Sequence, residues 1–250
     1  MNRIITMFIF VLLTSTLAAS DSIQFEKANR LYTEKQYTQA ALIYEQIISS
    51  QGVAPELHYN LGNAYFRMNE LGLSILNYER ALRLNPLYKD AAYNLEFVNS
   101  KVVDQVELNT TFFLKKWIAY LMRLLSPNNW FILAIPLFVL ALAGALLFFF
   151  GPTRTIRKSS FYIAGFLMLL TVISITFSVL RRNQLLNHSE AIILPGAIVI
   201  KAAPDKSGTD LFQLHEGTKV EVISELGEWY EIRLSNGNVG WIEQLHLARI

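Results

Sequence analysis

Two apolar runs long enough to cross a lipid bilayer constrain this chain more than any other feature. They span residues 130–150 and 161–180, and neither contains an Asp, Glu, Lys, Arg or His. The first holds 14 Leu, Ile, Val and Phe residues, which together favour insertion by about 4–8 kcal/mol. We predict two transmembrane helices that act as anchors, because both spans lack the ionisable residues that mark proton and ion pathways. A buried soluble hairpin is the alternative.

Charge is spread unevenly along the chain. Residues 112–185 carry 8 Lys and Arg and no acidic residue, residues 21–111 carry 8 against 11, and residues 186–250 carry 5 against 9. The excess of basic residues therefore flanks the apolar runs and forms no water-facing patch, which argues against nucleic acid as a partner. The absence of cysteine excludes disulfides, thiol catalysis and zinc–thiolate sites.

The N-terminus predicts a secretory signal peptide over residues 1–20. Arg3 precedes an apolar run, residues 4–13, and small residues come next, near a cleavage site at Ala18 to Ser20. The run is shorter than the roughly 20 residues of a membrane span, although a permanent anchor remains the alternative. Because such a signal exports the chain on its C-terminal side, we expect a short cytoplasmic loop at 151–160. Both soluble parts then lie on the periplasmic side of a bacterial inner membrane.

The segment 112–125, just before the first span, predicts an amphipathic helix. At 100° per residue, Lys115, Lys116 and Arg123 fall within one arc. The opposite face carries apolar residues, which are Leu114, Trp117, Ile118, Leu121, Leu124 and Leu125. This division favours a helix that lies along the surface of the lipid bilayer, with packing against protein as the alternative.

A 34-residue period runs through residues 21–102. Tyr44 recurs as Tyr78, and the triplet beginning at Tyr59 recurs at Tyr93. Small residues stand where two antiparallel helices approach closely, at Ala28, Ala40, Gly62 and Ala81. With Pro86 as a helix stop, this pattern resembles the tetratricopeptide repeat. The resemblance implies two helix pairs, 21–54 and 55–88, and a capping helix from residue 89 to about 102.

In that family the first helix of each pair lines a concave groove. The resemblance implies a candidate groove with aromatic and amide side chains that suit a peptide or a partner helix: Phe25, Asn29, Tyr32, Tyr59, Asn63, Phe66, Arg67, Tyr93 and Phe97. A carboxylate clamp is not expected, because Phe25, Asp90 and Asn94 occupy its cation positions. The asparagines have an alternative role, which is to bond neighbouring backbone inside the repeat.

After residue 185 the apolar period changes from 3.6 to 2, which indicates strands. Five or so short strands, with a hairpin turn at Asn236-Gly237, predict a small barrel. Residues 186–250 resemble bacterial SH3 (SH3b) domains through a run that includes Gly217, Gly240 and Trp241. The resemblance implies binding of cell-wall peptides or proteins at Phe212, Trp229, Tyr230 and Trp241. Alternatively, the tryptophans fill the barrel core.

No pattern of catalytic, metal-binding or cofactor-binding residues is present in the sequence. The four histidines, His58, His188, His215 and His246, lie in different predicted units without metal-ligand spacing. No nucleophile, base and orienting group are grouped, and no glycine-rich phosphate loop occurs. We therefore expect a protein that is not an enzyme and needs no cofactor.

The parts together predict a multidomain membrane protein, with an all-α helical repeat, two transmembrane α-helices and a small all-β SH3-like barrel. This order resembles the BatE proteins of the bacteroides aerotolerance operons. The resemblance implies an adaptor in tolerance of oxygen or envelope stress. Its implied partners are sibling membrane proteins with von Willebrand A domains and an AAA+ ATPase. The rival interpretation is an envelope anchor whose barrel binds peptidoglycan.

Overall fold

The computed structural model describes residues 23–104, 113–186 and 189–250. The predicted signal peptide lies outside these residues. The chain divides into two units, of which one comprises Met1–Asn109 with His188–Ile250 and the other comprises Thr110–Asn187. The described part of the first unit contains the helical repeat and the barrel, and we name it the repeat–barrel body. The second unit contains the apolar helices.

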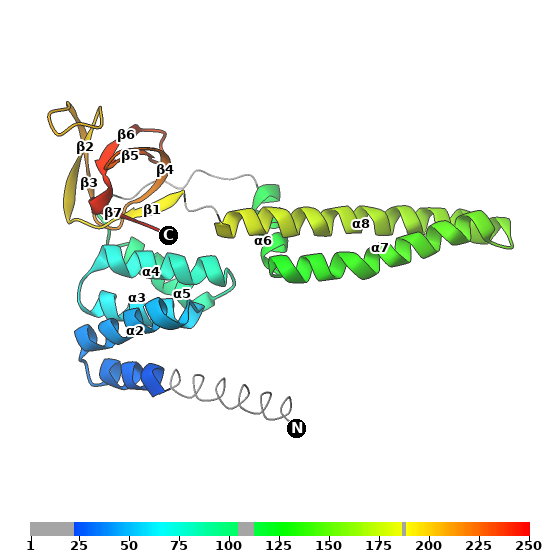
Figure 1. Ribbon diagram of the computed structural model, residues 1–250, viewed down its shortest axis with the longest axis horizontal. Helices are drawn as coiled ribbons and strands as arrows, with labels where there is room; N and C mark the ends of the chain where they lie inside the picture. Colours follow the sequence, from blue (N-terminus) through cyan, green and yellow to red (C-terminus); the bar gives the residue numbers. More distant parts are fainter. Residues whose placement is uncertain (1–22, 105–112, 187–188) are drawn as a thin grey trace, which may run out of the picture. The chain divides into compact units, whose positions relative to one another are not determined.

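The repeat consists of antiparallel helices stacked in chain order (Figure 1). Residues 23–33 form the first helix, and the others are α2 (Tyr37–Gln51), α3 (Pro55–Arg67), α4 (Leu71–Leu84) and α5 (Lys89–Asn99). The turns inside the two pairs match, since Lys35 and Asn69 both have φ near +60°. Gly62 is small for a steric reason, because a Cβ there would lie 2.8 Å from the Tyr78 ring. The predicted helical repeat is confirmed.

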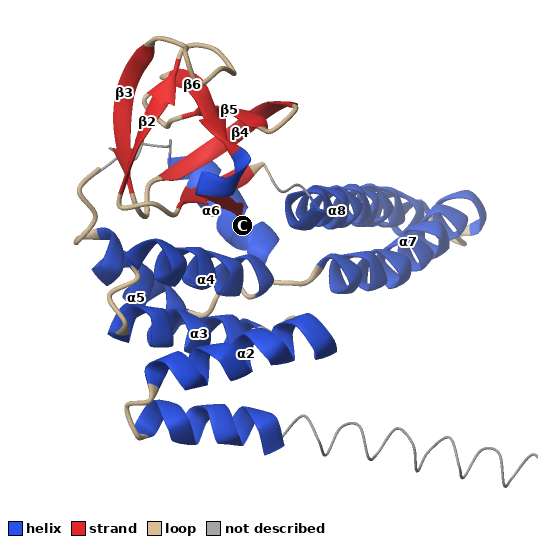
Figure 2. Ribbon diagram, turned by 60° about the vertical axis from the view of Figure 1, so that its left-hand side comes forward, coloured by secondary structure: helices blue, strands red, loops and turns tan. Residues whose placement is uncertain are grey.

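The barrel is a curled antiparallel sheet of seven strands (Figure 2). These are β1 (Glu190–Ile193), β2 (Ala197–Lys201), β3 (Asp210–His215), β4 (Lys219–Leu226), β5 (Trp229–Arg233), β6 (Val239–Glu243) and β7 (Leu247–Arg249), in the order β3-β2-β6-β5-β4-β1-β7. The SH3-like fold is confirmed, but five was too few strands. Strands β1 and β7 have only four and three residues, which is too short to show alternation in the sequence.

The second unit is a helical hairpin with one further helix. It contains α6 (Phe113–Arg123), α7 (Pro127–Phe150) and α8 (Arg154–Leu186). Most side chains of α7 and α8 are exposed, and both helices are long and apolar enough to cross a membrane. Hydroxyl groups of α8 bond back to α7, as Ser174 Oγ donates to the carbonyl oxygen of Trp130 at 2.7 Å.

The predicted loop at 151–160 is mostly helical. Helix α8 begins at Arg154, so only residues 151–153 connect the two long helices. Thr153 explains this early start, because its Oγ1 accepts the Ile156 N–H at 3.3 Å and caps the first turn. The charged residues of the predicted loop thus extend α8 beyond its apolar stretch.

Candidate functional site

Hydrogen bonds between asparagines and tyrosines link the helices of the repeat. The Asn29 Oδ1 accepts the Tyr44 hydroxyl at 2.6 Å and the Asn60 Nδ2 at 3.2 Å. The same set recurs 34 residues later, where Asn63 Oδ1 accepts from Tyr78 and Asn94 at 2.6 and 2.9 Å. Burial raises the pKa of Tyr44 and Tyr78 to about 12, so both hydroxyls remain donors. Asn29 and Asn63 therefore bond to side chains of the repeat, whereas the alternative interpretation had them bond to neighbouring backbone.

The aromatic residues of the candidate groove differ in how much ring they expose. Tyr93 is 72% exposed on α5, and Phe97, one turn later, is 48% exposed. Phe97 packs edge-on against Phe66, with ring centroids 5.8 Å apart, and Lys101 lies over its face at 4.9 Å. Tyr59, in contrast, is packed between other tyrosines. An incoming chain would therefore meet aromatic surface mainly on α5.

The register of the strands divides the four candidate residues of the barrel into two that face the core and two that face outward. Tyr230 pairs with the buried Ile242, and Phe212 pairs with the buried Ile200, so both rings pack against the core. The two tryptophans lie at alternate positions, opposite Glu243 and Glu231, and face outward. The alternative that tryptophans fill the core is wrong. The core is aliphatic, with Ile193, Ile200, Val220, Ile232 and Ile242 among its members.

A pocket of about 310 Å³ lies beside Trp229 on the barrel. Its lining includes Ile198, Gln213, Lys206 and Glu243, and the last two form an ion pair at 3.4 Å. Of the four predicted barrel residues, only Trp229 lines it. The Trp229 ring provides apolar contact for a ligand, and Lys206 and Glu243 beside it provide a hydrogen-bond donor and an acceptor.

Direct packing of the barrel on the repeat was not predicted from sequence. Ile192 of β1 and Ile250 are buried in one cluster with Ile75 of α4 and with Val98 and Val102, which belong to α5 and the segment after it. Helix α5 begins 34 residues after α3, and the barrel covers the end of the stack beside α4 and α5. Solenoids need a cap at such an end, and here the barrel is the cap.

Polar contacts surround this apolar interface. Arg80 donates to the carbonyl oxygen of Arg249 at 2.6 Å, and Arg83 donates to a main-chain oxygen of Ile250. Lys219 lies 3.2 Å from a carboxylate oxygen of Glu79 and 3.0 Å from one of Glu190. Burial lowers the pKa of Lys219, but the two carboxylates outweigh burial and raise it above its ordinary value. The repeat and the barrel are therefore joined by apolar packing and by polar contacts, as the parts of a single domain are.

Comparison with known families supports the two halves of this body. Residues 55–88 match the family model of the tetratricopeptide repeat, and residues 196–248 match that of the bacterial SH3 domain. The search of curated proteins found no match. Both are non-catalytic interaction domains. Among the described residues, no group of three or more His, Asp or Glu could hold a metal ion.

Proposed function

We propose that this chain is a non-enzymatic adaptor, anchored in a bacterial inner membrane with the repeat–barrel body on the periplasmic side. The observation that carries the proposal is the union of two interaction domains in one body, connected to a pair of apolar helices. The helices bind the lipid bilayer, with α6 at its surface. The body binds protein, needs no cofactor and does not bind nucleic acid.

The order of parts supports a place in an aerotolerance or envelope-stress complex. The proposed partners are Bat membrane proteins with von Willebrand A domains and an associated AAA+ ATPase. The exposed rings of Tyr93 and Phe97 supply the contact area, because buried aromatic side chains dominate binding at protein interfaces. The proposed site extends from these residues over the rest of the predicted groove.

Replacing Tyr93 and Phe97 together by alanine should reduce recovery of membrane partners at least about tenfold, since each aromatic anchor contributes roughly 1–2 kcal/mol. Recovery is measured by affinity purification from gently solubilised membranes with quantitative mass spectrometry. Leu42→Ala is the control, because Leu42 is a 54% exposed apolar residue on α2. Unchanged recovery from the double variant would exclude α5 as the binding surface.

The outward-facing Trp229 and its pocket favour peptidoglycan binding as the second candidate function. Purified sacculi test it with the Trp229→Ala and Trp241→Ala variants. Retention of the parent chain and its loss in these variants would support the envelope anchor. Deleting the barrel is a poor test, because the deletion also uncovers the end of the repeat.

Sidedness can be measured because the chain has no cysteine. Single cysteines at Tyr93 and Leu245 should react with a membrane-impermeant maleimide in intact spheroplasts, whereas one at Ser159 should react only after permeabilisation. All three positions are exposed, so burial does not explain a difference. Labelling at position 159 alone in intact spheroplasts would contradict the proposed orientation.

A further inference from the structure

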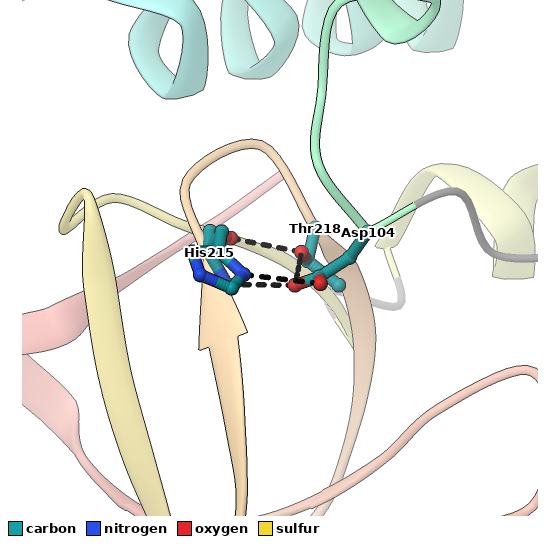
Figure 3. A network of polar contacts seen from close by, with 3 residues as sticks. All are labelled: Asp104, His215 and Thr218. Carbon is teal, nitrogen blue, oxygen red and sulfur yellow. Dashed lines mark hydrogen bonds and ion pairs between the residues drawn. The ribbon is translucent and has the colours of Figure 1, made fainter.

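Asp104, the last described residue before the segment with the apolar helices, is bonded to the turn between β3 and β4. One carboxylate oxygen accepts the backbone N–H of His215 at 2.7 Å and the Thr218 hydroxyl at 2.9 Å (Figure 3). The other lies 3.1 Å from Nδ1 of His215. Burial raises the pKa of Asp104, yet these hydrogen bonds outweigh it and hold the pKa below its ordinary value. Asp104 is therefore a charged acceptor at neutral pH.

The chain returns to the body in β1, which is bonded to the same turn. The Ile193 N–H donates to the carbonyl oxygen of Thr218 at 3.0 Å, and the Gly217 N–H donates to the carbonyl oxygen of Ile193 at 2.8 Å. Residues 104 and 193 lie on opposite sides of the membrane segment in sequence. Both are nevertheless fastened to four consecutive residues, 215–218.

The turn also contacts the interior of the body. Thr218 is almost fully buried, and Gly217 lies so close to Ile75 and Val102 that a Cβ would approach them to 2.7 and 2.8 Å. Val102 is only three residues beyond the end of α5, the helix that presents Tyr93 and Phe97. The turn therefore touches the segment that joins the candidate groove to the membrane segment.

We infer that residues 215–218 form a latch that fastens both connections to the membrane segment at one point and holds the end of α5 in place. Asp104 is the residue that closes the latch. A displacement of Asp104 or Ile193 is taken up by the turn and does not reach the aromatic surface on α5. The barrel thus contributes to the proposed groove as a positioning element, without lining it.

Hydrogen exchange of the full-length chain in lipid nanodiscs tests the latch. Asp104→Asn replaces the carboxylate that accepts from the His215 N–H and the Thr218 hydroxyl by an uncharged amide. Thr218→Val removes the hydroxyl donor and keeps nearly the same side-chain volume. In both variants we expect the His215 and Gly217 amides to exchange at least about tenfold faster. The same increase is expected at Ile193 and Val102, which a local loss of one bond would not affect. Glu96→Gln, an exposed charge change on α5, is the control and should leave these rates unchanged.

The latch is overturned if only His215 responds, because the two connections are then fastened independently. Faster exchange throughout α2 and α3 would also overturn it, since that pattern reports general unfolding. Unchanged rates in both variants would show that the contacts hold nothing in place. The measurement uses no partner, so its outcome is independent of whether the proposed adaptor function is correct.

Discussion

Ile192→Asp should unfold the repeat together with the barrel. Ile192 is fully buried among residues of α4, α5 and β7. The substitution removes its apolar contacts and places a carboxylate without a partner in the interface, a combined cost of about 4–5 kcal/mol or more. Such a cost approaches the whole stability of a typical domain. Pulse proteolysis in urea on the full-length chain would show cleavage of residues 23–104 at much lower urea than in the parent.

Two further variants make this result specific to the interface. Leu245→Asp puts the same charge on the same barrel at a position 71% exposed and should change stability little. Ile192→Val removes one methylene and should cost about 1 kcal/mol. If the repeat stays protected in Ile192→Asp while the barrel is digested, the barrel is not the cap of the repeat.

The repeat and the apolar helices could be predicted from sequence because each shows a regular pattern among residues that are close along the chain. The 34-residue repeat and the apolar runs need no knowledge of distant partners. The interface between repeat and barrel is different in kind. Gly72 bonds to Glu216 and Arg80 to Arg249, across separations of 144 and 169 residues. The sequence around one residue of such a pair does not indicate which distant residue it contacts.

The candidate site was predictable only in part, for reasons visible in particular residues. The sequence left two roles open for Asn29 and Asn63, in the groove or inside the repeat, and the structure shows their side chains bonded to those of Tyr44 and Tyr78. On the barrel, alternation along β5 separates Trp229, Glu231 and Arg233 from Tyr230 and Ile232. That pattern was available in the sequence and placed the tryptophan with charged residues, outside the core.

A methyl group added at Gly217 should weaken the repeat–barrel body strongly. Gly217 has φ +83°, where an alanine costs about 1–2 kcal/mol. Its Cβ would also lie 2.7 Å from Ile75 Cδ1 and 2.8 Å from Val102 Cγ2, and such overpacking costs about 1–3 kcal/mol more. Ile75 is almost fully buried and has little room to move. We expect Gly217→Ala to lower the free energy of unfolding by about 2–5 kcal/mol.

Gly237 supplies a matched control for the backbone cost. It has φ +92° in the same barrel, and a Cβ there meets no atom within 4 Å. Gly237→Ala should therefore show the cost of the left-handed backbone alone. The difference between the two variants in urea-dependent proteolysis isolates the contact of the turn with Ile75 and Val102. Equal losses would mean that the repeat yields to the extra methyl group, and a rigid junction between repeat and barrel would then be ruled out.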